Sequence, residues 1–342
     1  MGSKASVRHY FAEGLTLKGY ISLLPGRRPD WERTYVLLGG PGTGKSTLIK
    51  MIGYELLDRG YELDFLRSVQ DPDAMAGLVL PHYRLAMLDA QKISPLRWHA
   101  PGLIEHFLDF SLFLDKDLLR RRRDDFITLE EKLEQAQAKV EEGMSLEFGA
   151  WLAEKPARCS RVINVNVPGW HEVSVPLPDN PAPWSLAAQA LAKLQKSTLY
   201  PCFLQGLTPE GWLNLAPYFL GDCDQIRLEG EETLDALNWL SREVQHLGQV
   251  AEIVLHPLDP DEIIGIVFPE RKLALWQGNP ERLTDQGLKE TLGPELTEAL
   301  TERARINNLL KGIYTETVDF AAVDKLREQV LNQILRELEA EA

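Results

Sequence analysis

Residues 39–46 read Gly-Gly-Pro-Gly-Thr-Gly-Lys-Ser and match the phosphate-binding pattern GxxxxGK[ST] at each fixed position. Glycines at these positions let backbone N–H groups turn inward, and a following helix adds the positive end of its dipole. A polyphosphate would therefore meet hydrogen-bond donors and a favourable potential in one place. The alternative interpretation is a glycine-rich turn that only starts a helix, but the full motif with an apolar run on either side favours phosphate binding.

The motif gives several residues a chemical role. Lys45 is expected to reach the β- and γ-phosphates of ATP, as one of two expected catalytic residues, and Ser46 is expected to bind Mg²⁺ through its hydroxyl. The residues expected to contact ATP are Gly40, Pro41, Gly42, Thr43, Gly44, Lys45, Ser46 and Thr47.

A phosphate-binding loop needs a second carboxylate on the magnesium side, and Asp89 is placed to supply it. It follows the apolar run 85–88, which fits a buried strand, and open α/β sheets bind ligands beyond the carboxyl ends of their strands. We expect Asp89 to be the second catalytic residue and to hold Mg²⁺ through water. The alternative is an ordinary aspartate in a turn at the end of a strand.

No glutamate follows Asp89, because the next residue is Ala90. The group that positions the attacking water must then come from elsewhere, or hydrolysis is slow. Asp64 and Arg67 flank the carboxyl end of the next strand, and His99 follows a tryptophan in a loop. Each is a candidate for the site, and each also fits a surface, turn or packing role.

The elements around the motif predict an α/β fold. Apolar runs indicate strands at 35–38, 63–66 and 85–88, and a helix is expected from 45 to 58, ended by Arg59-Gly60. A further apolar segment covers 77–81. This order is typical of a doubly wound, P-loop NTPase-like parallel sheet flanked by helices.

Composition shifts divide the chain. We predict a P-loop NTPase domain at 1–155, whose last part, about 102–155, is a helical arm because apolar residues recur there three and four apart. A proline-rich linker with a small hairpin is expected at 156–198, and a second domain at 199–342. The apolar spacing from Leu326 to Leu338 predicts an amphipathic C-terminal helix, which packs on the core or against a helix at 296–314.

The second domain repeats the first. Residues 11–20 recur at 203–212 (203 − 11 = 192), and residues 71–81 recur at 259–269 (259 − 71 = 188). Two matches in the same order at nearly equal offsets predict duplication of a whole α/β unit. The alternative is that two similar turns arose independently.

The second copy lacks the chemistry of the first. It has no GK[ST], and it carries Glu229, Glu231 and Glu232 where phosphates would lie. The position equivalent to Asp89 is Gln277 (89 + 188 = 277). We expect a degenerate half that forms an internal pseudo-dimer, part of a substrate pocket or a partner surface.

Charge and composition limit the function classes. The 342 residues carry a formal net charge of −14, which works against general binding of DNA or RNA. The run of arginines at 120–123 is surrounded by aspartates, which favours an ion-paired helix face over an arginine finger or a partner patch.

Without a membrane-spanning or signal-like apolar run, the chain is expected in the cytoplasm. Cys159, Cys202 and Cys223 are expected to be reduced thiols.

Several segments together carry a family resemblance. RHYF (8–11), GGPGTGKST (39–47), DPD (71–73), the apolar segment ending at Pro81 and LDA (88–90) precede a helical arm and a related second half. This order resembles a bacterial, mainly Firmicutes, family of two-domain P-loop ATPases with tandem NTPase-like halves. The resemblance implies an intracellular ATP-binding protein. The chain departs from the family pattern, because its second phosphate-binding loop is lost and the usual Thr-Ala-Pro-His stretch after Asp89 is absent.

Three functions follow from these observations. The first is an ATPase or ATP-driven switch with one nucleotide site, in which Mg²⁺-ATP reorients the helical arm and an unknown protein partner reads the change. The second is a P-loop kinase that phosphorylates a small molecule. The third is a nucleotide-binding regulatory scaffold with little turnover. No NKxD motif supports a preference for GTP, and the oligomeric state is left open.

Overall fold

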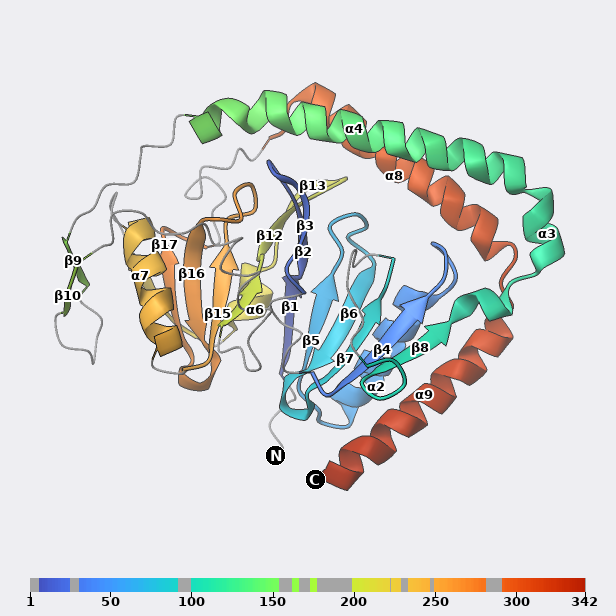
Figure 1. Cartoon of the computed structure of the whole chain (residues 1–342), viewed down its shortest axis with the longest axis horizontal. Helices are drawn as coiled ribbons and strands as arrows, with labels where there is room; N and C mark the ends of the chain where they lie inside the picture. The colour runs from blue at the N-terminus through green and yellow to red at the C-terminus, as the bar shows by residue number, and fades with distance from the viewer. Residues whose placement is uncertain are drawn as a thin grey trace.

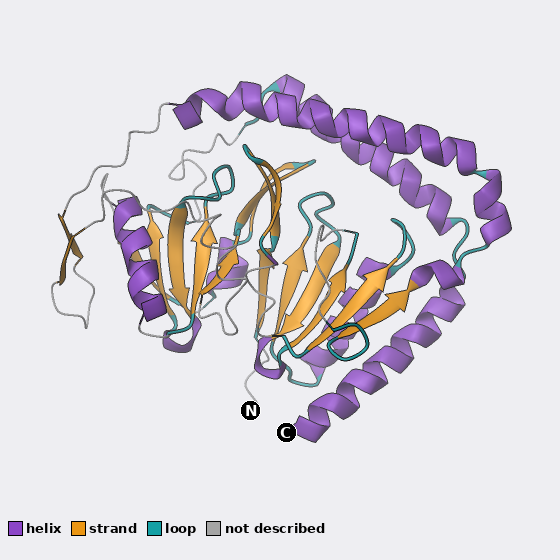
Figure 2. Ribbon diagram, viewed as in Figure 1, coloured by secondary structure: helices purple, strands orange, loops and turns teal. Residues whose placement is uncertain are grey.

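The structure is a computed structural model that describes residues 6–24, 31–91, 100–153, 162–165, 173–176, 199–221, 223–228, 233–246, 249–280 and 291–341. These residues form two large β-sheets and three two-stranded ones, with helices packed around the large sheets, so the expected α/β class is confirmed. Figure 1 shows a long pair of helices that crosses above both sheets. Figure 2 shows the two sheets side by side.

The first sheet holds the strands around the predicted phosphate-binding loop. Its order is β1-β5-β6-β7-β4-β8. The bounds are β1 Val7–Phe11, β4 Arg33–Leu38, β5 Leu63–Arg67, β6 Met75–Leu80, β7 Leu85–Asp89 and β8 Glu105–Asp109. β1 is parallel to β5, and β4 is parallel to both β7 and β8. β6 is antiparallel to β5 and to β7, so the expected parallel sheet is wrong and the sheet is mixed.

Short connections decide the direction of β6. Only the 3₁₀ turn η2 (Pro81–Tyr83) and Arg84 separate β6 from β7, and Arg84 adopts the left-handed conformation with φ of 50°. Parallel neighbours need a crossover of about a dozen residues or more, whereas a tight turn can only reverse the chain. The apolar segment 77–81 thus belongs to a hairpin rather than to a parallel strand.

The second sheet repeats the first. Its strands are β11 Leu199–Cys202, β14 Asp224–Leu228, β15 Ala251–Leu255, β16 Ile263–Phe268 and β17 Leu273–Gln277, in the order β11-β15-β16-β17-β14. The strand directions follow the same pattern, with β16 antiparallel to both neighbours. The equivalent helices α2 (Lys45–Asp58) and α7 (Thr233–His246) are 14 residues each and start 188 apart (233 − 45 = 188).

Irregular details recur at the same offset. After η4 (Pro269–Arg271), Lys272 is left-handed with φ of 48°, and it lies 188 residues after Arg84 (272 − 84 = 188). The irregularity between Leu66 and Arg67 recurs between Val254 and Leu255 (254 − 66 = 188). The left-handed turn residue and the strand irregularity have different physical causes. Because both recur after 188 residues, the similarity extends over the whole of each half.

The halves meet through equivalent residues. Phe11 N–H donates to the Phe203 carbonyl over 2.9 Å, and Phe203 N–H donates to the Phe11 carbonyl over 3.0 Å. The following hairpins, β2–β3 (Glu13–Thr16, Gly19–Ser22) and β12–β13 (Gln205–Thr208, Gly211–Asn214), lie beside this bridge. The Phe203 ring contacts Gly14, and the Phe11 ring contacts Gly206. A self-complementary contact of this kind has the character of a two-fold interface.

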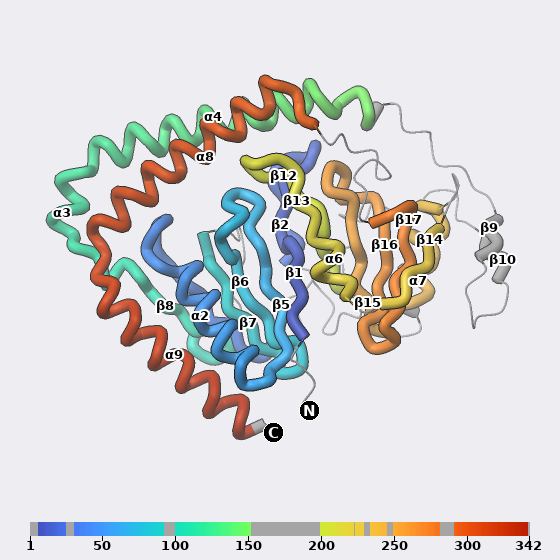
Figure 3. Tube along the Cα trace, turned by 180° about the vertical axis from the view of Figure 1, so that it is seen from behind, coloured from blue at the N-terminus to red at the C-terminus, as the bar shows by residue number. Residues whose placement is uncertain are grey.

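Two long helices form the arm. α3 (Lys116–Arg121) leads into α4 (Arg123–Ala153), which runs along α8 (Pro294–Thr315), as Figures 1 and 3 both show. Val140 and Phe148 of α4 share a core with Leu300 of α8 and with Leu15 and Leu207 of the two hairpins. The arm starts later than the expected residue 102, because β8 and the 3₁₀ turn η3 (Phe110–Phe113) come first.

The last helix returns to the first sheet. In α9 (Phe320–Glu341), Val330, Ile334 and Leu338 are buried in the same core as Leu48 and Ile52 of α2. The C-terminal helix therefore packs on the first half, and α8 takes α4 as its neighbour instead. The remaining elements are α6 (Ala216–Leu220) and an antiparallel hairpin, β9 (Val162–Val165) with β10 (Val173–Pro176). In the described part of the chain, no helix is both long enough and apolar enough to cross a bilayer.

Candidate functional site

The loop between β4 and α2, which we call the glycine-rich loop (39–46), turns through conformations that need glycine. Gly39, Gly42 and Gly44 have φ values of 141°, 78° and 95°. Side chains other than hydrogen are strained at such angles. The loop reverses the chain at the end of a central strand, so the first turn of α2 starts at the carboxyl edge of the sheet.

Lys45 is buried beneath this loop, with 3% of its surface exposed. Its ammonium group donates to the carbonyl of Gly39 over 2.7 Å and to that of Gly40 over 2.5 Å. Asp89 Oδ1 lies 3.7 Å from the same Nζ. The sheet explains this meeting, because β4 and β7 are parallel neighbours in which Leu37 is paired with Asp89.

Gln91 is a member of the site that sequence reasoning missed. Its backbone N–H donates to Asp89 Oδ1 over 3.1 Å, and its side-chain oxygen lies 3.4 Å from Lys45 Nζ. An acceptor bonded by the N–H two residues later is an Asx turn, which aspartates at strand ends often form. The position of Gln91 two residues after Asp89 could therefore have indicated that it belongs to the site.

The hydroxyls of the loop have different tasks. Thr43 is buried and donates to the Gly40 carbonyl over 2.9 Å, which closes the loop on itself. Ser46 Oγ accepts from the N–H of Met75 over 2.8 Å, at the start of β6. Thr47 is exposed on α2, and Pro41 is half-buried.

The expected magnesium ligands are hard oxygen donors. A serine hydroxyl, a carboxylate and phosphate oxygens suit Mg²⁺, which keeps several waters and takes few ligands from the protein itself. Ser46 on α2 provides the hydroxyl, and Asp89 at the end of β7, the strand beside β4, provides the carboxylate. Among the described residues, no group of three or more histidine, cysteine, aspartate or glutamate side chains forms a metal cage of its own.

The end of α8 and the start of α9 cover the glycine-rich loop. The Tyr314 ring lies against Gly40 so closely that a methyl group on Gly40 would overlap it. A methyl on Gly42 would stand 2.5 Å from the Lys311 carbonyl, and Phe320 and Val323 lie beside Gly44. We call residues 311–323 the cover. Sequence reasoning did not predict it, because no local pattern marks a contact between segments so far apart along the chain.

Polar contacts hold the cover in place. Lys311 forms an ion pair with Asp71, in the connection between β5 and β6. Thr315 donates to the Lys311 carbonyl over 2.8 Å, and its Oγ1 lies 3.4 Å from the Gly42 carbonyl. The Tyr314 ring packs edge-on against Phe126 with centroids 5.7 Å apart, and burial together with nearby Glu130 raises its pKa.

The cover opposes negative charge at the loop. It presents the C-terminal end of α8, which carries the negative end of the helix dipole. A triphosphate drawn to the N-terminal end of α2 would face this negative end. Tyr314 and Lys311 of the cover therefore occupy the space beside Gly40 and Gly42 that a polyphosphate at this loop would need.

The other candidates near the loop serve different purposes. Asp64 accepts two hydrogen bonds from Arg8, at 2.7 and 2.6 Å, and Arg8 also reaches Glu252 of the second sheet at 3.4 Å. This partly buried ion cluster joins the two halves. Burial disfavours the charged form of Arg8, but the attraction of Asp64 and Glu252 outweighs burial and raises its pKa. Arg67 donates to the Pro72 carbonyl. His99 lies outside the described residues.

The degenerate half and the arginine run can also be placed. Gln277 ends β17, equivalent to Asp89 at the end of β7, whereas Glu229, Glu231 and Glu232 lie outside the described residues. In the arginine run, Arg120 pairs with Asp117, and Arg122 pairs with Asp125 and Glu316, all with exposed side chains. Cys202 is buried and Cys223 half-buried, with no disulfide between them, and Cys159 is not among the described residues.

Comparison of the chain with family models, curated proteins and solved structures gave no match. The resemblance to two-domain P-loop ATPases therefore stays an inference from the motifs quoted above.

Proposed function

We propose that the protein binds Mg²⁺-ATP at the glycine-rich loop and acts as an ATPase or ATP-driven switch with a single nucleotide site in its first half. One observation carries the proposal. Lys45 and Asp89, which lie on different elements, come within 3.7 Å of each other beneath a loop that matches the phosphate-binding motif. Two buried, opposite charges at the carboxyl edge of a sheet are what phosphoryl chemistry needs there.

Each residue has a role in this proposal. The loop amides and the start of α2 hold the phosphates, and Lys45 exchanges the Gly39 and Gly40 carbonyls for phosphate oxygens. Ser46 and Asp89 hold Mg²⁺, which supplies charge neutralisation when bound. Gln91 lies close enough to Lys45 to orient a water, a task that a glutamine performs in other P-loop enzymes.

Because the cover lies on the glycine-rich loop, we favour an ATP-driven switch over a simple ATPase. ATP must displace Tyr314 and the last turn of α8 from Gly40 and Gly42, so nucleotide binding and helix position are linked. α8 runs along α4 over much of its length, so the displacement passes to the whole arm. Linkage is reciprocal, and a partner that holds the arm open would strengthen ATP binding by the same factor.

We also propose that the two halves descend from one duplicated unit. Three observations support it: the same order of the five strands that have counterparts in both sheets, the shared offset of the left-handed residues Arg84 and Lys272, and the reciprocal bridge between Phe11 and Phe203. The second half has lost the motif and keeps the role of an internal partner.

The test is binding of a fluorescent ATP analogue to the full chain, with and without Mg²⁺. Lys45→Ala should weaken binding at least tenfold, whereas Lys50→Ala, on the same helix but outside the loop, should not change it. Unchanged binding by Lys45→Ala would refute the site. ATP labelled at the γ-phosphate then separates the alternatives: released phosphate indicates an ATPase, label on an added metabolite a kinase, and binding without turnover a scaffold.

A further inference from the structure

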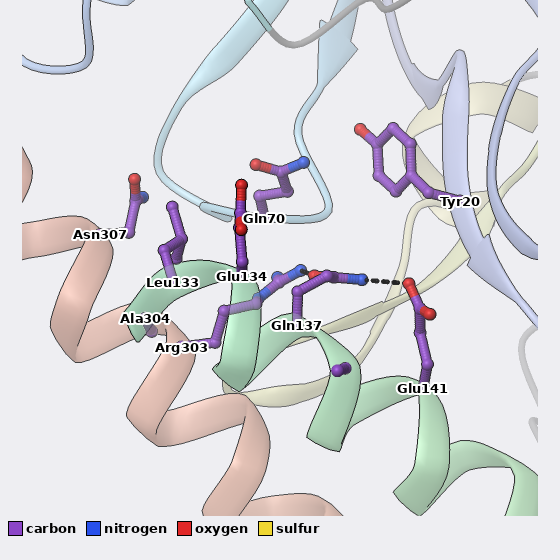
Figure 4. Close-up of a pocket in the computed structure, with 10 residues that line it drawn as sticks. Tyr20, Gln70, Leu133, Glu134, Gln137, Glu141, Arg303, Ala304 and Asn307 are labelled. Carbon is purple, nitrogen blue, oxygen red and sulfur yellow. Dashed lines mark hydrogen bonds between the residues drawn. The ribbon is translucent and has the colours of Figure 1, made fainter. Parts of the chain in front are cut away.

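A cavity lined by both polar and apolar groups lies beneath the arm, away from the glycine-rich loop. Its volume is about 490 Å³, and it opens between α4, α8, the β2–β3 hairpin and the connection from β5 to β6. Figure 4 shows Arg303 of α8 and Gln137 of α4 pointing toward each other, with Tyr20 and Gln70 on the opposite side. None of the functions discussed so far uses these residues.

Arg303 is the unusual feature of the cavity. Only 6% of its surface is exposed, and its one hydrogen bond to the described residues goes to the side-chain oxygen of Gln137 over 2.9 Å. No carboxylate in the described part of the chain lies within ion-pair distance of it. Burial lowers the pKa of Arg303 in spite of the attraction of Tyr20 and Glu13. Burial of a guanidinium that no described carboxylate contacts directly is costly, and Arg303 still has donors to offer.

The rim of the cavity has the opposite charge. Glu134 and Glu141 are exposed side chains on α4, seven residues or about two turns apart. Gln137 links floor and rim, because its amide nitrogen donates to Glu141 over 2.9 Å while its oxygen accepts from Arg303. Leu133, Ala138 and Ala304 also line the cavity and contribute to its apolar surface. The cavity thus separates a buried cation from two exposed anions.

We propose that this cavity binds a small zwitterion of the amino-acid class, with its carboxylate on Arg303 and its ammonium group toward Glu134 and Glu141. A planar carboxylate matches the fork of guanidinium donors. Phosphate fits less well, because the rim carboxylates would repel a multiply charged anion. A simple carboxylate such as acetate would satisfy Arg303 but would leave the rim without a partner.

The site lies close to the cover. Asn307, which lines the cavity, precedes Lys311 by four residues, or about 6 Å along the helix. Gln70 also lines it and is the neighbour of Asp71, which pairs with Lys311. An occupant therefore touches the two segments that hold the cover, although its binding does not require ATP.

The experiment measures the unfolding midpoint of the full chain with each of the standard amino acids, with sodium acetate and with inorganic phosphate. We expect at least one amino acid to raise Tm by several degrees, through binding to the folded state alone. Arg303→Met should abolish this rise without lowering the Tm of the unliganded chain. Arg305→Met is the matched control, because Arg305 is exposed on the same helix and pairs with Glu302.

Three results would overturn the proposal. They are no shift with any amino acid, an equal shift with acetate or phosphate, and an unchanged shift in Arg303→Met. Should Arg303→Met fail to fold, the double variant Glu134→Gln with Glu141→Gln decides the matter. Both residues are exposed, and their removal should weaken amino-acid affinity about tenfold at the same Tm; unchanged affinity would exclude the assigned orientation.

Discussion

The ring of Tyr314 lies directly on Gly40, so a residue near the end of α8 closes a loop that belongs to the other half of the chain. The contact depends on the aromatic ring of Tyr314 and on the missing side chain of Gly40. A flat ring covers the loop, and a glycine without a side chain lets it come close.

Removal of the ring should free the loop. Tyr314→Ala is expected to strengthen ATP binding several-fold, because the nucleotide no longer has to displace the ring, while it lowers the free energy of unfolding by about 1–2 kcal/mol. Titration with a fluorescent ATP analogue and urea unfolding measure the two effects. Tyr218→Ala, at a residue with 62% exposure, is the control. Weaker ATP binding in Tyr314→Ala would mean that the ring holds nucleotide rather than excludes it.

A methyl group on the loop should push the cover away. Gly42→Ala places Cβ 2.5 Å from the Lys311 carbonyl at φ of 78°, whereas Gly60→Ala has nothing within 4 Å at φ of 91°. Both variants carry the strain of a left-handed alanine, about 1–2 kcal/mol. Urea unfolding should show an added loss in Gly42→Ala alone. Equal losses would show that the cover does not press on Gly42.

Asp89→Asn tests the metal side of the site. The amide keeps the size of the side chain but loses the charge that faces Lys45 and Mg²⁺. We expect ATP binding to lose most of its dependence on Mg²⁺, and the protein to lose about 3 kcal/mol of stability because Lys45 stays buried without its anion. Binding with and without EDTA checks the first effect. A full Mg²⁺ response in Asp89→Asn would place the metal elsewhere.

Much of this region could be predicted from sequence, since its signals are local. Glycine spacing marked the loop, and continuous apolar runs marked β4, β5 and β7. β8 escaped because its residues Glu105–Asp109 form a polar edge strand without an apolar run. The cover and the cavity around Arg303 escaped for another reason: both arise where distant helices meet, and no spacing within one segment encodes that meeting.

Gln91→Ala separates turnover from binding. Since the Gln91 side chain lies 3.4 Å from Lys45 Nζ, its loss should lower phosphate release at least tenfold and leave ATP affinity within a factor of two. Single-turnover measurement of labelled phosphate provides the rate. A rate that does not change would remove Gln91 from the chemistry.

The half-buried ring of His9 should make the free energy of unfolding depend on pH. It stacks on Phe65 with centroids 5.5 Å apart, and its pKa is lowered by burial first and by Arg67 second. The unfolded chain then binds a proton at higher pH than the folded chain, so the folded state loses stability as the pH falls below about 6.5 toward the lowered pKa. His9→Gln should flatten this loss in urea unfolding from pH 7.5 to 5, and His82→Gln, at an exposed histidine, should not. Parallel curves for wild type and His9→Gln would contradict the assignment.

The return of α9 to the first sheet sets the order in which the molecule can mature. Val330, Ile334 and Leu338 complete a core whose other members, such as Leu48 and Ile52, leave the ribosome almost three hundred residues earlier. The first sheet must therefore wait, with an apolar face open, until synthesis has passed residue 338. A chain truncated within the second half would contain the glycine-rich loop and all strands of the first sheet. It would lack α9, which covers the apolar face of that sheet.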